Sequence, residues 1–128
     1  MPSNNALAVG KRLVELCNQH KEKQAMEELY AANIVSVEAM QGPNMPQRIE
    51  GIDAVRKKGE WWVSNHEIHS SSAAGPYPHG DRFIVNFKYD VTSKTGPMAG
   101  QRMKLDECGL YTVKDGKIVQ EEFFYDMG

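Results

Sequence analysis

Two adjacent glutamates interrupt the most apolar stretch near the end of the chain, KIVQEEFFYD at 117–126. The β-branched and aromatic residues around them predict a strand. Because neighbouring residues of a strand point to opposite faces of its sheet, Glu121 and Glu122 cannot both face the interior. A carboxylate on the inner face must be protonated, paired or hydrated, since an unpaired buried charge is costly. One of the two is therefore a candidate for proton transfer or for binding the polar end of a ligand.

A third glutamate shares a face with Glu121 in the hairpin that closes the chain. The dipeptide at 115–116, Asp-Gly, predicts a tight turn between two strands, and alternation then places Glu107 on the same side as Glu121. Counting back from the turn puts Glu121 opposite Leu110. Glu107 then lies too far along its strand to touch Glu121, so we assign no direct contact between the two glutamates. Carboxylates on one apolar face could share a proton or orient a ligand. The alternative is an ion pair at the rim of the sheet with a basic residue, namely Arg102, Lys104 or Lys88.

The spacing of apolar residues changes along the chain from a helical to a strand period. In the first half they recur every three or four residues, as in Val9, Leu13 and Leu16, which predicts amphipathic helices. In the second half they alternate with polar residues, as in FIVNFKY at 83–89, which predicts an antiparallel meander. Helices that cover one face of such a sheet make an α+β domain. The predicted helices span 4–20, 22–31 and 50–66, the predicted strands 33–40, 67–75, 81–93, 101–113 and 118–126, and a loop spans 41–47.

The overall composition excludes several classes of partner. With 15 basic and 17 acidic residues the net charge is −2, and the basic cluster at 56–58 fits the solvated face of a helix, so we expect no nucleic-acid partner. No apolar run of roughly 18 residues is present, so we expect no contact with a membrane. The N-terminal residues do not resemble a secretory signal, which favours the cytoplasm and two unpaired, buried cysteines, Cys17 and Cys108. A chain of 128 residues suits one domain over 1–128.

Four segments carry a resemblance to a known family. LYAANIVSVEA at 29–39 is similar to a passage from a helix end into a first strand, and EGIDAVR at 50–56 to the start of a third helix. TGPMAGQ at 95–101 and DGKIVQEEFFYD at 115–126 are similar to a hairpin and a closing strand. Together, in this order, they resemble the nuclear transport factor 2-like superfamily, and within it the SnoaL-like branch. The resemblance implies a cone-shaped barrel of a curved mixed, mostly antiparallel sheet, packed by three N-terminal helices.

The resemblance also implies a pocket and its lining. The family's sheet wraps a cavity on its concave side, so Glu121 is expected to face inward and Glu122 outward. The implied ligand is a small hydrophobic organic molecule with a carbonyl, hydroxyl or ring oxygen, bound without a cofactor. The alternative is that side chains fill the barrel completely. The residues expected to line the pocket are Trp62, Phe83, Val85, Phe87, Met103, Leu105, Tyr111, Phe123 and Tyr125.

The isomerase branch of the family places its general base at the end of the first strand, where this chain has Glu38. A desolvated carboxylate has a raised pKa and could move a proton to and from a carbon next to a carbonyl. The alternative is that Glu38 faces solvent or binds a loop amide near Gln41. We take Glu38, Glu121 and Glu107 as the candidate catalytic residues.

The chain also departs from the chemistries known in the family. The isomerases have an oxyanion-binding tyrosine and a second acid where this chain has Val14 and Gly109, and the SnoaL cyclases have an acid where it has Phe123. The Asp-Arg-Asp set of the epoxide hydrolases is not found either. The sequence thus leaves open a cofactor-free isomerase, cyclase or hydratase, a non-catalytic binding or dimerisation module, and a protein-interaction domain. A phenol donor could come from another direction, from Tyr30, Tyr111 or Tyr125.

Two further surfaces carry expectations. His66 and His69 flank Glu67, but they straddle a predicted helix boundary without a third ligand nearby, so we expect no metal site and leave open an acid/base role at the pocket mouth. On the outer face of the sheet the resemblance implies a homodimer. The residues predicted to share that face are Ile118, Glu122 and Phe124.

Overall fold

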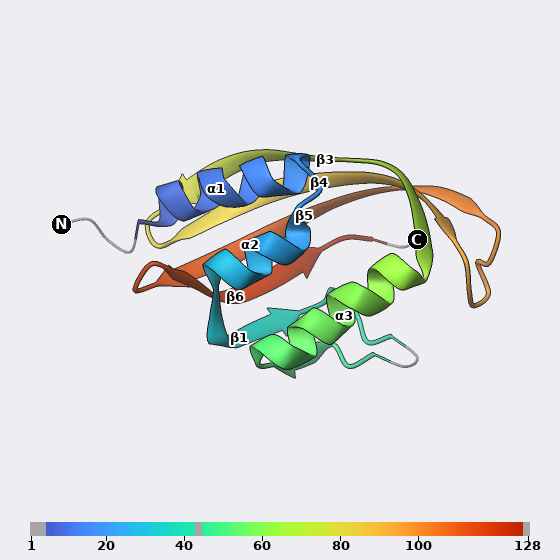
Figure 1. Ribbon diagram of the computed structural model, residues 1–128, viewed down its shortest axis with the longest axis horizontal. Coiled ribbons are helices and arrows are strands. Elements are labelled where there is room, and N and C mark those ends of the chain that lie inside the picture. Colours follow the sequence, from blue (N-terminus) through green and yellow to red (C-terminus); the bar gives the residue numbers. More distant parts are fainter. Residues whose placement is uncertain (1–4, 43–44, 127–128) are drawn as a thin grey trace.

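The computed structural model describes residues 5–42 and 45–126, and this part of the chain forms three helices and six strands (Figure 1). The first residue of the helix predicted over 4–20 and residues 43 and 44 of the predicted loop lie outside the described residues. The helices are α1 (Ala6–Asn18), α2 (Glu22–Leu29) and α3 (Ile52–Ser64). The strands are β1 (Tyr30–Val37), β2 (Arg48–Glu50), β3 (His66–His79), β4 (Arg82–Ser93), β5 (Arg102–Lys114) and β6 (Lys117–Phe124).

The six strands form one open sheet in the order β2-β1-β6-β5-β4-β3. β1 and β6 run parallel and every other neighbouring pair runs antiparallel. The predicted meander, β3 to β6, and the predicted mixed, mostly antiparallel α+β architecture are confirmed. The sheet curves but does not close, because its two edges, β2 and β3, do not pair with each other.

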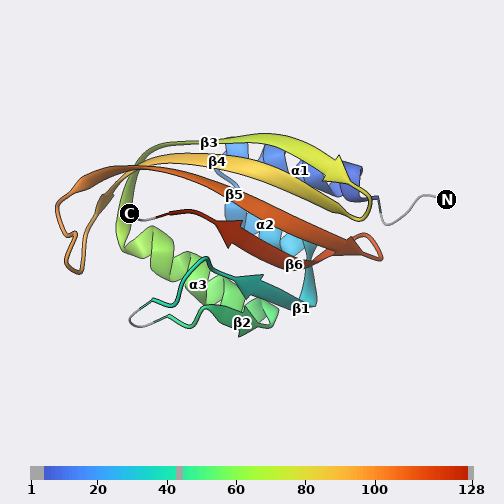
Figure 2. The same cartoon turned by 180° about the vertical axis from the view of Figure 1, so that it is seen from behind.

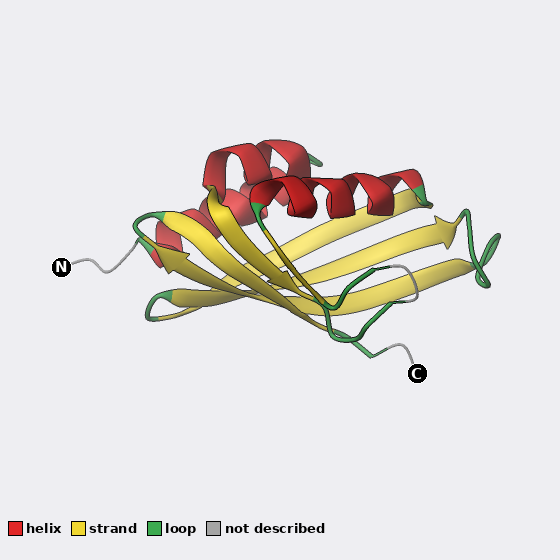
Figure 3. Cartoon of the chain, turned by 90° about the horizontal axis from the view of Figure 1, so that it is seen from below, coloured by secondary structure: helices red, strands yellow, loops and turns green. Residues whose placement is uncertain are grey.

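All three helices lie on one face of the sheet, as Figure 3 shows from below. α1 contacts β3 and β4, whereas α3 contacts β1 and β2 at the other edge and also β3, the strand that follows it in the chain. Figure 2 views the molecule from behind, with the strands in front of the helices. The helix-covered face is therefore the interior, and side chains that point to it from the strands meet helices rather than water.

The core lies between this face and the helices. On β4 the alternation predicted from the sequence is realised, since Phe83, Val85 and Phe87 are at most 5% exposed. From α1, Leu13 and Leu16 meet them and are 2% and 1% exposed. Full burial of such a side chain stabilises a fold by roughly 1.5–3 kcal/mol, so this layer fixes the sheet against α1.

The approach of α1 to the sheet depends on a glycine. A Cβ at Gly10 would lie 2.7 Å from Cβ of Pro76 on β3 and 3.1 Å from the ring of Phe83. Carbon atoms without a bond between them do not come this close, so any larger residue would push the helix away from β3.

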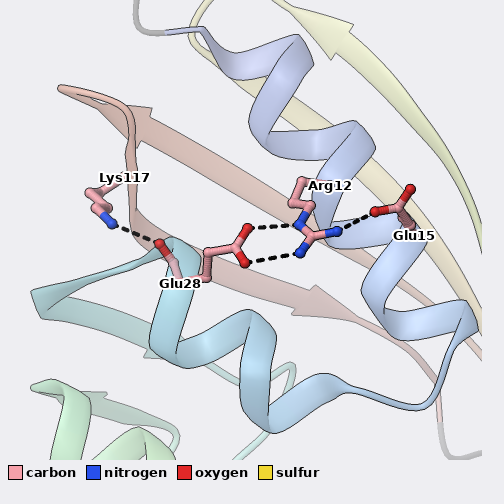
Figure 4. A network of polar contacts seen from close by, with 4 residues as sticks. All are labelled: Arg12, Glu15, Glu28 and Lys117. Atoms are coloured by element: carbon pink, nitrogen blue, oxygen red, sulfur yellow. Dashed lines mark hydrogen bonds and ion pairs between the residues drawn. The ribbon is translucent and has the colours of Figure 1, made fainter.

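Charged contacts outside the core join α1 to α2 (Figure 4). Arg12 donates two hydrogen bonds to the Glu28 carboxylate, at 2.7 and 3.1 Å, and also contacts Glu15. The Arg12 hydrogen bond lowers the pKa of the Glu28 carboxyl, and Lys117 of β6 donates to the Glu28 backbone oxygen at 2.7 Å. Exposed ion pairs contribute little stability, so this network orients α2 more than it stabilises the fold.

The passage from α2 into β1 differs from the prediction. The helix predicted over 22–31 ends at Leu29, and Tyr30 already belongs to the strand. Tyr30 pairs with Ile118 of β6, and this sheet pairing prevails over the helical spacing of the apolar residues. The short edge strand β2 was not predicted at all.

The closing hairpin keeps its predicted turn but not its predicted register. Asp115 and Gly116 both have positive φ, 52° and 78°, as the expected two-residue turn requires. β6 then bulges between Ile118 and Gln120, so that Glu121 pairs with Tyr111 and not with Leu110. The bulge also turns Ile118 inward, where it is 0% exposed, so its predicted place on the outer face is wrong.

Candidate functional site

Glu121 is the buried member of the adjacent pair on β6. It is 3% exposed, whereas Glu122 is partly exposed. The Tyr30 hydroxyl donates to its Oε1, and the Ser36 hydroxyl donates to its Oε2 at 2.7 Å. Both donors come from β1, in which Ser36 is the direct partner of Glu121 across the parallel pair. Burial raises the pKa of the Glu121 carboxyl, and the Tyr30 bond and the charge of Lys58 oppose that rise.

A lysine from α3 extends these contacts toward the surface. Lys58 is mostly buried, donates to the Ser36 hydroxyl oxygen at 2.7 Å and forms an ion pair with Glu38. Its ammonium lies 5.2 Å from the centre of the Phe123 ring, and the Tyr125 hydroxyl donates to Glu38 at 3.0 Å. The resulting chain of polar contacts runs from the core to the surface through Tyr30, Glu121, Ser36, Lys58, Glu38 and Tyr125.

Glu107 lies beside this chain without joining it. It is the β5 partner of Phe87, so it points to the helix-covered face, and it is partly buried. Among the described residues, no side chain donates a hydrogen bond or forms an ion pair to its carboxylate. Burial, with the negative charges of Glu38 and Glu121, raises the pKa of Glu107 to about 7, and the charge of Lys58 opposes this. Near neutral pH, Glu107 therefore exists in both protonation states.

The predicted lining residues separate into a filled end and an open end. Phe83, Val85, Phe87 and Tyr111 are at most 5% exposed and belong to the continuous core. This end of the interior is filled by side chains, so a ligand would meet only the other end. The remaining five predicted lining residues all retain partial exposure, namely Trp62, Met103, Leu105, Phe123 and Tyr125.

One surface depression borders the open end. Its volume is about 300 Å³, and its lining includes Glu38, Phe123 and Tyr125 together with the neighbouring Glu122 and Phe124. A larger depression of about 420 Å³ lies between the start of α1 and the β3–β4 turn and is lined by none of the candidate glutamates. We place the candidate site at the smaller depression because Glu38 and Tyr125, the surface end of the polar chain, line it. Glu107 and Glu121 are not among its lining residues.

His66 and His69 make contacts other than those of the polar chain. His66 stacks on Trp62, with ring centres 4.4 Å apart, and its Nδ1 lies 2.8 Å from the Trp62 backbone oxygen. The ring of His69 instead contacts the Thr92 hydroxyl at 2.7 Å. Within residues 5–42 and 45–126, no three His, Cys, Asp or Glu residues are arranged to hold a metal ion, and no helix is long and apolar enough to cross a bilayer.

A comparison against family models identifies the family of this fold. The model described as the SnoaL-like domain matches residues 5–125. The chain belongs to the SnoaL-like family. A search of curated protein sequences finds no match.

Solved structures agree with this assignment. A Mesorhizobium loti protein, provisionally called a SnoaL-like polyketide cyclase and, in brackets, a carbohydrate phosphatase, is 44% identical with a TM-score of 0.86, over 93% of this chain and 97% of that one. A Bacillus subtilis protein, provisionally called an isomerase, is 20% identical with a TM-score of 0.72, over 94% and 86%. A Catenulispora acidiphila protein with a ketosteroid isomerase-like fold, in complex with trimethylamine, is 14% identical with a TM-score of 0.69, over 93% and 85%. The last two show the fold alone.

The structure shows what occupies the three positions where the chain departs from the chemistries that the resemblance implies. At Gly109, where the isomerase branch has its second acid, an added Cβ would lie 2.7 Å from the Tyr111 ring and 3.1 Å from its hydroxyl oxygen. The tyrosine ring therefore occupies the space above the glycine. At Phe123, where the cyclases have an acid, the ring faces the Lys58 ammonium. Val14 packs against the core and offers no polar group.

The sequence analysis did not predict three of the polar residues that contact the candidate glutamates. Ser36 lies on the inward side of β1 with Ile34, so its position was readable from alternation. Lys58 follows the buried Val55 by three residues, which places it on the inner face of α3, although its cluster with Arg56 suggested a solvated surface. Tyr30 was named as a phenol donor, but its pairing with Glu121 depends on the position where α2 ends.

Proposed function

We propose that this SnoaL-like protein binds a small, mainly apolar organic molecule at the open end of its concave face and moves a proton with the Glu107 carboxylate. The reaction class is removal of a proton from a carbon next to a carbonyl and its return, without a cofactor, as isomerases, cyclases or hydratases require. The supporting observation is that Glu107 points to the interior without a donor in the described part of the chain and has a pKa of about 7. A base is most effective when its pKa lies near the working pH.

The other two candidate glutamates are less suited to this role. Glu121 is 3% exposed, and both of its oxygens accept hydrogen bonds. Glu38 forms an ion pair with Lys58 and accepts a hydrogen bond from Tyr125, so a proton arriving on it would weaken both contacts. We assign these two glutamates a positioning role, because their charges raise the pKa of Glu107.

The neighbouring side chains suit a compact apolar ligand with one polar end. Tyr89 and Trp62 are partly exposed, with ring centres 5.2 Å apart. Tyr89 also stacks at 6.2 Å on the buried Phe87, the cross-strand partner of Glu107. The polyketide cyclase name of the Mesorhizobium loti relative supports a ring-forming reaction of an enolisable compound. Two free cysteines support a reducing, cytoplasmic location.

The test is exchange of carbon-bound hydrogen in D₂O. A panel of small ketones, cyclic and aromatic, is incubated with the protein, and NMR measures the loss of the protons next to the carbonyl. Wild-type protein should accelerate exchange of at least one ketone, with a pH midpoint near 7. Glu107→Gln should lower that rate by about 10²–10⁴-fold, the usual contribution of a general base.

The matched control is Glu60→Gln, which removes the same group from an exposed position of α3. It should leave the exchange rate at the wild-type value. If the two variants exchange alike, or if wild type accelerates none of the ketones, proton transfer by Glu107 is refuted and a non-catalytic binding module is left.

A second candidate function is dimerisation through the face that carries no helix. Phe124 is 51% exposed there, and Ile84 and Tyr77 of β4 and β3 are 39% and 59% exposed. The register aligns Tyr77, Ile84 and Leu110 across three strands. A second copy of this chain would bury these side chains by the same face of its own sheet.

Sedimentation at micromolar concentration tests this proposal. Wild type should sediment as a dimer and Phe124→Glu as a monomer, because a carboxylate would be desolvated in the interface. Leu7→Glu is the control, since Leu7 is also exposed, at 45%, but lies on α1 away from this face. A monomeric wild type contradicts the proposal.

A further inference from the structure

Lys58 is the one lysine that the fold withdraws from water. Every other lysine of the chain lies in the described part and is exposed, whereas only 16% of the Lys58 side chain is exposed. Taking an ammonium group out of water is costly, and an arginine can form the same kind of ion pair. A lysine differs from an arginine because its amine can release a proton and then act as a nucleophile. The Lys58 amine is therefore a candidate for chemistry of its own.

The contacts of Lys58 have the arrangement of an activated nucleophile. Its Nζ forms an ion pair with Glu38, and the Tyr125 hydroxyl donates to the same carboxylate at 3.0 Å. Nζ also donates to the Ser36 hydroxyl oxygen at 2.7 Å, which fixes the end of a flexible side chain. A nucleophile beside a base, with the base oriented by a third group, is the usual arrangement in residues that attack a carbonyl carbon.

The 300 Å³ depression brings a ligand close to this amine. Lys58 is not among the residues that line the depression, but its ammonium contacts Glu38 and lies 5.2 Å from the centre of the Phe123 ring, and both of these residues line it. The volume lies at the lower end of the range for small-molecule sites, so it suits a compact ligand. A carbonyl group that enters between Glu38 and Phe123 meets Nζ, while an apolar body lies against the aromatic rings.

We propose that Lys58 forms an imine with a small apolar aldehyde that binds in this depression. This activity goes beyond the proton transfer proposed for Glu107 and does not depend on it, because ketone exchange needs no covalent bond to the protein. Aldehydes are the substrate class because their carbonyl carbon carries only one substituent besides hydrogen, which leaves it open to an amine held between neighbouring side chains.

The step balances without a further reactant. Lys58 passes one proton to Glu38, and the electron pair of Nζ forms a bond to the carbonyl carbon while one pair of the C=O bond moves to oxygen. That oxygen takes a second proton from Nζ and the proton held by Glu38, and it leaves as water. The nitrogen keeps one proton and its positive charge, so the iminium pairs with Glu38 as the ammonium did. Glu38 positions Glu107 in ketone exchange and acts as base and acid only in this step.

Reductive trapping tests the proposal on the full chain. Wild-type protein is incubated at neutral pH with benzaldehyde and excess sodium cyanoborohydride, which reduces an imine to a stable benzylamine. Peptide mass spectrometry then follows the label at each lysine over time. Lys58 should be labelled ahead of Lys57, its exposed neighbour on α3, which serves as the control within the same molecule. Labelling of Lys58 at the rate of Lys57 or more slowly overturns the proposal.

The role of Glu38 is tested by Glu38→Gln in the same assay. This variant should label Lys58 about 100-fold more slowly than wild type, which lies within the usual contribution of acid/base catalysis. The rate at Lys57 should stay unchanged. Labelling of Lys58 at the wild-type rate in this variant overturns the proposed step.

A competitor tests the binding site. Benzyl alcohol has the same ring as benzaldehyde and no carbonyl group, so it should slow labelling of Lys58 and leave Lys57 unaffected. An equal effect on both lysines would show that no binding site directs the aldehyde to Lys58, and would overturn the proposal.

Wild-type protein also separates this proposal from the one for Glu107. If Lys58 is labelled ahead of Lys57 but no ketone exchanges in D₂O, the function proposed for Glu107 fails and imine formation stands. If ketones exchange but Lys58 has no advantage over Lys57, imine formation fails and proton transfer stands.

Discussion

Replacing Glu107 by Gln should stabilise the folded protein above neutral pH, although it removes the group proposed to do the chemistry. The pKa of Glu107 is raised from its ordinary 4.5 to about 7, because burial and two neighbouring carboxylates disfavour its ionised form. Glutamine has nearly the same shape and carries no charge. The substitution thus removes an electrostatic penalty and leaves the packing in place.

The sign and size of the effect follow from proton linkage. Between pH 4.5 and 7 the folded protein retains a proton on Glu107 that the unfolded chain has released, so wild-type stability falls as pH rises through this window. At about 1.4 kcal/mol for each tenfold change in acidity, the full penalty is about 3 kcal/mol. Solvent reaches part of the side chain, so we expect about 2 kcal/mol to be measured. Burial also raises the pKa of Glu121, so its contribution to the pH dependence of stability has the same sign. This contribution is present in both proteins and cancels in the difference between them.

The assay is urea unfolding of wild type and Glu107→Gln at pH 4 and pH 8. The free energy of unfolding of the variant, minus that of wild type, should be about 2 kcal/mol more positive at pH 8 than at pH 4. Glu60→Gln, at an exposed position of α3, is the control for the substitution itself. A Glu107 difference that is independent of pH, or that has the opposite sign, would refute the account of the site given above.

Three other substitutions test the surroundings of Glu107. Lys58→Met removes the cation that lowers the pKa of Glu107, so the pH midpoint of ketone exchange should rise by about one pH unit; an unchanged midpoint would contradict this. Tyr30→Phe leaves the buried Glu121 carboxylate with one donor fewer and should destabilise the protein by about 2 kcal/mol in urea unfolding at pH 8, whereas wild-type stability would show that the bond contributes nothing. Gly109→Ala places a Cβ 2.7 Å from the tyrosine ring above it and should cost about 1–3 kcal/mol, which a melting temperature equal to that of wild type would disprove.

Most helices and strands could be predicted from the spacing of the apolar residues, because its period changes where the helices end and the meander begins. The faces of β4 and β5 follow from alternation alone, since one side of each strand is buried against helices. The register of β6 against β5 could not be predicted in this way. Nothing in the residues at 118–120 marks the bulge at Val119, and one extra residue moves Ile118 to the interior and shifts Glu121 by one partner.

The candidate site was predicted only in part, for a related reason. Alternation placed Glu107 and Glu121 on one face without a direct contact between them, but it contains no information about which of them meets a donor. That depends on β1, whose pairing with β6 is parallel and therefore between segments far apart in the sequence. Lys58 and Ser36 enter the site through this long-range pairing and through α3, and no local pattern connects them.

The distribution of donors, more than the number of acids, decides what each glutamate can do. Glu121 is the most deeply buried of the three, yet Tyr30 and Ser36 stabilise its charge, so its burial is compatible with a static role. Glu107 is less buried and receives no such support from the described residues, so burial and the neighbouring carboxylates raise its pKa to about 7. A side chain that only held the fold together would be expected to increase stability at the pH where the protein works. Glu107 is instead expected to lower stability at that pH. The Glu107→Gln variant should therefore gain stability at pH 8 and lose proton transfer. The two measurements together separate a functional carboxylate from a structural one.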